Sequence, residues 1–346
     1  MWAPGKSRSR LWRRVLGWTL GSVVVLASSC ARHEPVQETR VLMDTFATIT
    51  VYDRDKERDA ITHARDAAFA GMLEVELLTS CYRDCSQVSA INRLAPRAVK
   101  VSPAVTACLR EAHRVASLSE GAFDVTVGPL MRLWDFLSDQ PHVPDSAAIR
   151  GVLSMVDYRR VHTQGDTVWL EQLGMALDLG GIAKGLAVDV AIDSLRAHGI
   201  ADAMVDARSN LRTLVSPLTA GKRNVWIRHP RDPSRLFARF PMDEGCVATS
   251  GDYERFFLND SVRYHHILDP HTGWPARSCA SVTVLANSAM EADALSTALF
   301  VLGPERGLSL AERLPGVSAV FLIDNHGTIQ WQATERLRNR LQVVAP

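Results

Sequence analysis

The sequence predicts an α+β fold, with mixed or antiparallel sheets and helices packed outside them. Residues 41–52 alternate apolar and small polar side chains, which is typical of a strand. Residues 56–78 instead repeat apolar side chains at the spacing of a helix. The chain has neither the GxGxxG of a Rossmann dinucleotide fold nor the GxxxxGK[ST] of a Walker nucleotide site. These observations leave a Rossmann fold without support.

Length and charge narrow the class of protein. A chain of 346 residues suits one large domain or two intimately packed ones. Its composition, 47% hydrophobic and 22% charged, is that of a soluble globular protein. Residues 1–30 carry five basic and no acidic side chains, and the rest of the chain carries 34 basic and 38 acidic ones. A mildly acidic body gives no support to nucleic-acid binding, so no nucleic-acid partner is expected.

The N-terminus has the order of a lipoprotein signal peptide over residues 1–30. A basic run ends at Arg14, an apolar run follows over residues 15–27, and small residues precede Cys30. The apolar run is shorter than the roughly 20 residues that span a bilayer, and a short transmembrane anchor is the alternative. The Arg13-Arg14 pair leaves twin-arginine export as another route.

Lipidation at Cys30 would hold the exported protein on a bacterial membrane, facing the periplasm. Residues 31–40 are then expected to be a tether, and residues 41–346 the functional domain. An odd number of cysteines remains after Cys30, which leaves at least one free thiol in an oxidising compartment. Cys81 and Cys85 could pair or lie side by side on a helix. Without a CxxC pair or a His/Cys cluster, no zinc site is predicted.

Further elements are predicted in order along the chain. The pattern predicts a helix over 103–119, a short strand between Gly121 and Gly128, a short helix over 147–155, and two strands before residue 170. A helix is expected over about 182–195, a strand near Trp226, and a strand followed by a helix over 281–303. The last predicted elements are a short helix and then a strand over 319–323. An Asp-Asn-His-Gly turn follows that strand.

Residues 247–275 hold the densest group of candidate functional side chains. Thr249 to Gly251 is expected to be a small polar turn, where glycine lets the backbone approach a ligand. His265 and His266 precede the turn chemistry of Asp269-Pro270, so they should lie at a strand end facing a loop. A histidine there can act as a general base near neutral pH. The alternative is an ordinary hairpin with an exposed histidine pair.

Two helices carry groups suited to a diphosphate and its metal ion. Asp178 precedes Gly180-Gly181 at the start of a helix, where backbone N–H groups favour an anion. Asp293 and Thr297 lie four residues apart and share one face of a later helix. A carboxylate and a hydroxyl near a backbone carbonyl suit Mg²⁺. A solvated Asp and a Thr bonded to its own helix is the alternative.

Several separated strings resemble the ApbE family, the flavin transferases that move FMN from FAD onto a protein hydroxyl. The resemblance covers about residues 40–325, in the family's order. The matching strings are MDT at 43–45, SCY at 80–82, GAFDVTVGPLMRLWDF at 121–136, DLGGIAKG at 178–185, TSGDYERFF and YHHILDPHTGWP within 249–275, and ADALSTAL at 292–299.

The resemblance implies an ApbE-like fold with two intimately packed lobes and an FAD cleft between them. His266 would be the catalytic base, because the family's histidine directly precedes Ile267, with His265 the neighbouring candidate. Mg²⁺ would be held by Asp293, Thr297 and the Gly181 carbonyl. The residues implied to bind FAD are Met43, Tyr82, Ala122, Phe123, Asp124, Asp178, Lys184 and Ile267.

The implied reaction is Mg²⁺-dependent transfer of FMN from FAD to a Thr or Ser hydroxyl of an acceptor flavoprotein subunit, with release of AMP. Two alternatives remain: an FAD pyrophosphatase that gives FMN and AMP, and a non-catalytic, lipid-anchored FAD-binding protein. The chain departs from the family where Arg208-Ser209 replaces two glycines, and Arg208 could crowd the flavin or pair with a phosphate.

Overall fold

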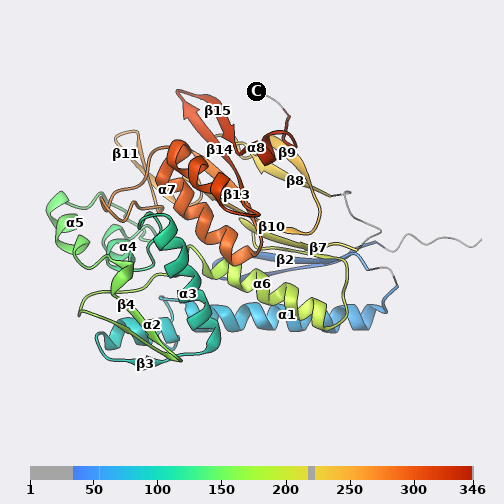
Figure 1. Ribbon diagram of the computed structural model, residues 1–346, viewed down its shortest axis with the longest axis horizontal. Coiled ribbons are helices and arrows are strands. Elements are labelled where there is room, and N and C mark those ends of the chain that lie inside the picture. The colour runs from blue at the N-terminus through green and yellow to red at the C-terminus, as the bar shows by residue number, and fades with distance from the viewer. Residues whose placement is uncertain (1–33, 54, 217–222, 345–346) are drawn as a thin grey trace, which may run out of the picture. The chain divides into compact units, whose positions relative to one another are not determined.

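The computed structural model describes residues 34–53, 55–216 and 223–344. The chain divides into two compact units, residues 1–34 and 35–346. The first unit is described only at Glu34, so the signal peptide, its transmembrane alternative and Cys30 all lie outside the described residues. The helices and strands labelled in Figure 1 all belong to the second unit.

The second unit contains both strands and helices. The strands are β1 (Val36–Leu42), β2 (Thr45–Val51), β3 (Val99–Lys100), β4 (Val161–Gln164), β5 (Thr167–Leu170), β6 (Ala203–Asp206), β7 (Asn210–Leu214), β8 (Arg223–Arg228), β9 (Leu236–Met242), β10 (Gly245–Gly251), β11 (Phe256–Asn259), β12 (Val262–His265), β13 (Ser281–Ala286), β14 (Ser318–Asn325), β15 (Thr328–Ala333) and β16 (Gln342–Val343). The helices are α1 (Arg58–Thr79), α2 (Gln87–Leu94), α3 (Pro103–Leu118), α4 (Gly128–Trp134), α5 (Ser146–Leu153), the 3-10 turn η1 (Tyr158–Arg160), α6 (Ala183–Ala197), α7 (Ala289–Arg313) and α8 (Glu335–Arg338).

An eight-stranded antiparallel sheet forms the centre of this unit, in the order β1-β2-β6-β7-β10-β13-β14-β15. Smaller sheets are made by β16-β9-β8, β3-β5-β4 and the β11–β12 hairpin. Helix α6 packs on α7 and on the central sheet, and α1 lies alongside α6 (Figure 1). The α+β fold with antiparallel sheets and surrounding helices is therefore confirmed.

Both faces of the central sheet are buried at β7, β10, β13 and β14, because these strands alternate between two hydrophobic clusters. On β10, Cys246 and Ala248 belong to the large cluster that includes α1, α3, α6 and α7, whereas Val247 faces the opposite side. On β14, Phe321 faces the helices and Val320 faces away from them. The second face is covered by β8, β9 and α8. Strand side chains alternate between faces, so one strand can serve two cores.

A third, smaller core is built around Trp134, whose side chain is fully buried. It combines α4 and α5 with the β11–β12 hairpin, through aromatic contacts of Trp134 with Phe257 and Tyr264. The Trp134 indole N–H donates to the carbonyl of Gly273, 2.9 Å away. This bond ties α4 to the loop that follows the histidine pair.

Polar caps fix where α3 and α7 begin. The Ser102 hydroxyl accepts the backbone N–H of Val105 at the start of α3, which has proline at its first position. Ser288 caps α7 by accepting the N–H of Glu291. Helix α7 runs past the expected end at residue 303, with a kink where Gly303 has a φ of +76° before Pro304.

Four expectations about local structure were wrong. Residues 41–52 are not one strand, because Met43 and Asp44 form a tight turn at positive φ between β1 and β2. Since β1 begins at Val36, the tether expected over 31–40 overlaps the folded sheet. Residues 122–127 form irregular backbone instead of a strand, and residues 249–251 continue β10 instead of turning. Strand β15 and helix α8 were not anticipated.

None of the helices in the described residues combines the length and the apolar character that a membrane-spanning helix needs. The five cysteines of the described chain, including Cys81 and Cys85, are all free thiols.

Candidate active site

One cavity of about 450 Å³ brings together every residue that the sequence assigned to a site. Its walls include His266, the three metal candidates and all eight cofactor candidates. The cavity lies where the large helical core meets the small Trp134 core: Phe123 and Ile267 belong to the first, and Leu268 belongs to the second. This junction corresponds to the cleft expected between two lobes. Its size is that of an ordinary ligand site.

His266 follows directly after β12, at the strand end that the sequence predicted. Its Nδ1 lies 3.2 Å from the carbonyl of Arg255, an acceptor, so Nδ1 carries the proton and Nε2 can accept one. Burial lowers the pKa of His266 to about 3, and the nearby Arg255 charge acts in the same direction. The imidazole is therefore neutral at neutral pH, as a general base must be.

His265 is excluded as the base because both of its nitrogens are engaged. Its Nε2 donates to the carbonyl of Ala276, 2.6 Å away, and its Nδ1 accepts the N–H of Ile267. The side chain is 3% exposed and packs edge-on against Phe300. His265 thus secures the loop that carries His266.

The start of α6 presents backbone groups to the cavity. Asp178 turns the chain by accepting the N–H of Gly180 at 2.7 Å, and its own N–H donates to the Val125 carbonyl. Lys184 donates to the Gly180 carbonyl from one turn along the helix. A helix start with a lysine beside it favours an anionic ligand. The arrangement suits the diphosphate of a dinucleotide.

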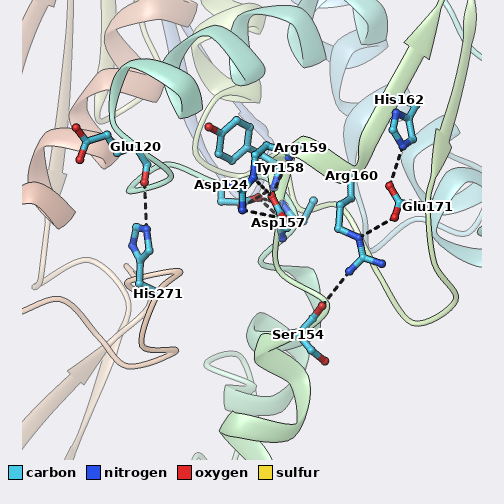
Figure 2. Close-up of polar contacts among 11 residues, drawn as sticks. Glu120, Asp124, Ser154, Asp157, Tyr158, Arg159, Arg160, His162, Glu171 and His271 are labelled. Atoms are coloured by element: carbon cyan, nitrogen blue, oxygen red, sulfur yellow. Dashed lines mark hydrogen bonds and ion pairs between the residues drawn. The ribbon is translucent and has the colours of Figure 1, made fainter.

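Asp124 is 7% exposed and shapes the irregular segment around it. Its Oδ1 accepts the N–H and the hydroxyl of Thr126, and its Oδ2 accepts the N–H of Tyr158 (Figure 2). Burial raises the pKa of Asp124, while these donors oppose that shift. A segment that the sequence presented as a strand is therefore held open by one carboxylate, which also lines the cavity.

The same figure shows a contact that holds the loop after His266 in place. His271 Nε2 lies 3.1 Å from the Glu120 carbonyl (Figure 2). The His271 Nδ1 lies 3.2 Å from the Asp269 carboxylate. The turn that follows His266 is thereby joined to the segment that begins at Gly121.

The proposed metal ligands form a fitting set of hard oxygens. Asp293 is 5% exposed, and burial raises the pKa of its carboxyl, so a cation beside it would be favourable. Its Oδ2 accepts the N–H of Gly185, which leaves further lone pairs on the carboxylate. Gly181 lies against Thr297: a side chain at Gly181 would place its Cβ 3.2 Å from the Thr297 hydroxyl.

Across residues 34–53, 55–216 and 223–344, no three His, Cys, Asp or Glu side chains gather as a metal cluster. The set around Asp293 is of another kind, since it has a single carboxylate and would depend on substrate phosphates to complete the coordination. Such partial protein ligation is usual for Mg²⁺ at phosphate sites.

Met43 and Tyr82 lie at the open side of the cavity. The Met43 N–H donates to Glu76 at the end of α1, which fixes the β1–β2 turn against that helix. Tyr82 is 61% exposed, so its ring is free to stack on a planar group.

No individual role was predicted for several polar residues of this cavity, notably Ser250, Glu254 and Arg255. The Ser250 hydroxyl lies 3.4 Å from that of Thr297 and 2.8 Å from that of Ser296. Ser250, Glu254 and Arg255 all lie in the TSGDYERFF string at 249–257, so their place in that motif could have indicated that they line the site.

Arg208, whose effect was left open, forms an ion pair with Glu254 at 3.1 Å, and both side chains line the cavity. Its φ is +65°, a left-handed backbone conformation that favours glycine. The turn between β6 and β7 therefore keeps a glycine-like geometry even though a long cation occupies it.

Comparison with known proteins gives consistent results. The model of the ApbE family matches residues 43–321. An FAD:protein FMN transferase of Treponema pallidum (strain Nichols) is 37% identical over 330 residues, covering 88% of this chain and 91% of that protein. Another from Klebsiella pneumoniae (strain 342) is 33% identical, covering 86% and 92%.

Solved structures agree with the sequence relatives. The ApbE protein of Thermotoga maritima superposes with a TM-score of 0.80 at 30% identity, covering 89% of this chain and 99% of that one. The flavin transferase ApbE of Vibrio cholerae gives a TM-score of 0.77 at 29% identity, with the same coverage.

Proposed function

This chain belongs to the ApbE family, and we propose that it is an FAD:protein FMN transferase. It would move FMN from FAD to a Thr or Ser hydroxyl of an acceptor flavoprotein and release AMP. The observation that carries the proposal is the convergence of His266, the α6 start and the Asp293–Thr297 pair on one cavity. A base, an anion site and a hard-oxygen site are what this reaction requires.

The acceptor hydroxyl would donate its proton to Nε2 of His266 as its oxygen bonds to the FMN-side phosphorus. The bond from that phosphorus to the AMP oxygen breaks, and AMP leaves with the electron pair. Arg255 holds the other nitrogen of His266 through its carbonyl, which keeps Nε2 available for this step. The α6 start and Lys184 would orient the diphosphate.

Asp293, Thr297 and the Gly181 carbonyl would hold Mg²⁺, whose charge would offset that of the diphosphate. Met43, Tyr82, Ala122, Phe123, Asp124, Asp178 and Ile267 would contact the rest of FAD from the cavity wall. Tyr82 supplies the exposed ring for stacking, and Phe123 and Ile267 supply apolar surface.

The test is incubation of the full chain, purified in mild detergent, with FAD, Mg²⁺ and a flavoprotein subunit carrying an acceptor Thr. Covalent flavin fluorescence on the acceptor after denaturing electrophoresis, with one AMP per label, is the expected result. AMP and FMN without labelling would instead identify a pyrophosphatase. FAD recovered intact would leave only a flavin-binding protein.

The N-terminus supports a proposal about location. Lipidation of Cys30 would keep the enzyme on the periplasmic side of a bacterial membrane, beside exported acceptor subunits. Metabolic labelling with a radioactive fatty acid should mark the wild-type chain, and Cys30→Ser should remove the label and release the protein from the membrane fraction. Unlabelled wild-type protein would contradict the proposal.

A further inference from the structure

A second cavity, of about 580 Å³, is separated from the first by the irregular segment over residues 122–127. The residues of this segment divide between the two cavities. Ala122, Phe123, Asp124 and Val127 line the first, whereas Val125 lines the second. The segment is thus a wall shared by two cavities.

One face of α3 forms one side of the second cavity. Thr106, Leu109, Arg110 and His113 follow each other at helical spacing and all line it. Opposite them are Tyr158 and the start of β4. Leu109 is buried, whereas Arg110 and His113 are exposed, so the cavity has an apolar floor and a basic rim.

Two arginines and two histidines line this cavity. They are Arg110 and His113 from α3, and Arg159 and His162 from the opposite side, with no carboxylate among the lining residues. Figure 2 shows Arg159 close to Asp124, and His162 on β4.

Two of these four side chains already pair with carboxylates that do not line the cavity. Arg159 pairs with Asp157 at 2.8 Å, and His162 Nε2 lies 3.2 Å from Glu171. For Arg110 and His113, no ion pair or hydrogen bond to a carboxylate is formed within the described chain. A guanidinium in such a position is suited to the two oxygens of a phosphate or carboxylate.

The apolar part of the cavity shows what the rest of the ligand would be. The half-buried Tyr158 ring meets His113 edge-on, with ring centroids 5.4 Å apart, and Val125 and Val161 lie beside it. Aromatic and aliphatic surface next to an anion site favours a ligand with a planar or apolar body.

We propose that this cavity is a second ligand site, which binds a phosphate monoester of mononucleotide size. Arg110 and His113 would bind the phosphate, and Tyr158, Val125 and Val161 would contact the body. The site is separate from the first cavity, and it rests on the function proposed above only in that its test uses FAD to fill that cavity.

The experiment measures binding of AMP to the full-length protein in detergent, saturated with FAD and without Mg²⁺, by isothermal titration calorimetry. Saturation with FAD closes the first cavity to AMP, so AMP can bind only elsewhere. The expected result is one AMP per chain, with adenosine and inorganic phosphate each binding at least tenfold more weakly.

Two matched variants assign the site. Arg110→Glu should raise the AMP dissociation constant by about tenfold or more, the size of effect that a charge-assisted hydrogen bond gives. Arg97→Glu makes the same charge change at an exposed residue outside both cavities and should leave the constant unchanged.

Three outcomes would overturn the proposal. They are no binding of AMP to the FAD-saturated protein, equal weakening by both variants, and binding of adenosine as tight as that of AMP. Equal melting temperatures of the three proteins would show that the comparison reports on binding and not on folding.

Discussion

At the scale of single residues, the two adjacent histidines lie at the end of β12 and have different surroundings. His265 is the last residue of β12 and is buried with both nitrogens bonded, whereas His266 faces the cavity with one nitrogen free to accept a proton. Successive side chains of a strand point to opposite sides, so neighbours of the same type face different surroundings.

His266→Ala should lower the rate of FMN transfer by about 10²–10⁴-fold, because a positioned general base contributes that much. FAD affinity should change by only a few fold, since the imidazole is assigned to proton transfer. Stopped-time labelling of the acceptor gives the rate, and quenching of flavin fluorescence gives the affinity. A variant that labels at the wild-type rate would remove His266 from the mechanism.

His265→Gln serves as the contrasting variant. It should lower the stability by about 1–3 kcal/mol, since it disturbs a buried hydrogen-bonded group. The residual folded protein should keep most of its turnover rate.

Asp206, at the end of β6, should make stability depend on pH. Burial raises its pKa from 3.8 to about 6, so between these values the folded state holds a proton that the unfolded state has lost. The stabilisation that protonation brings is complete below pH 3.8 and is lost as the pH rises through about 6. The Asn side chain of the Asp206→Asn variant does not titrate, so it contributes no such pH dependence.

The free energy of unfolding of Asp206→Asn, relative to wild type, should therefore rise by about 1–3 kcal/mol between about pH 4.5 and about pH 7.5. Urea denaturation at both pH values measures it. A difference between the two proteins that stays constant with pH would mean that the Asp206 carboxyl titrates normally in the folded state.

Arg208 combines two opposing effects at one position. Its positive φ costs about 1 kcal/mol, and its exposed ion pair with Glu254 contributes about 0–1 kcal/mol. Arg208→Gly relieves the strain and loses the pair, whereas Arg208→Ala keeps the strain and also loses the pair.

We therefore expect Arg208→Ala to be about 1 kcal/mol less stable than Arg208→Gly, as measured by the midpoint of urea unfolding. An alanine variant as stable as the glycine variant would show that this turn does not need a left-handed residue.

At the scale of elements, α6 and α7 together build the side of the cavity that is proposed to hold Mg²⁺. They pack so closely at Gly185 that an added Cβ would lie 2.2 Å from the carbonyl of Ala289. The approach lets Asp293 of α7 accept the Gly185 N–H. Asp189 of α6 accepts the first N–H groups of α7, from Ala289 and Met290, which fixes the two helices end to side.

Gly185→Ala should destabilise the protein by about 3 kcal/mol, because the clash is with backbone atoms that cannot move aside. Thermal unfolding followed by circular dichroism measures the loss. Gly151→Ala is the matched control: no atom lies within 4 Å of its added Cβ, and alanine favours helix α5. Equal stability of the two variants would contradict the tight packing of α6 on α7.

At the scale of the folded unit 35–346, the cavity is where two hydrophobic cores meet, so a bound ligand would join them. A ligand that binds only the folded state stabilises it by about 2.7 kcal/mol at 100 times its dissociation constant. For a folded unit of this size, that corresponds to about 4 °C in melting temperature.

We expect FAD with Mg²⁺ to raise the melting temperature by about this amount in the wild-type protein. Asp293→Asn should lose the part of the shift that depends on Mg²⁺ and retain the part given by FAD alone. Differential scanning fluorimetry with each ligand separately and together makes the comparison. An Mg²⁺ response that persists in Asp293→Asn would show that residues other than Asp293 hold the metal ion.

The sequence alone determined the fold class, the main helices and the membership of the cavity. The twelve candidate residues lie in strings whose order and spacing resemble the ApbE family, and all twelve line one cavity. Helical periodicity located α1, α3 and α7, because burial on one face of a long helix leaves a repeating pattern.

Only the tertiary structure decided the details that depend on distant partners. Alternating residues look alike on both sides of a two-residue turn, so residues 41–52 were predicted as one strand, although Met43 and Asp44 turn the chain there at positive φ. Asp124 holds residues 122–127 out of a strand through Tyr158, which lies 34 residues away. The resemblance selected His266 over His265, and only the structure shows the physical difference: both nitrogens of His265 are bonded, whereas His266 is bonded through Nδ1 alone. Local patterns report which side chains need burial, whereas hydrogen-bond partners far along the chain are set only when the cores come together.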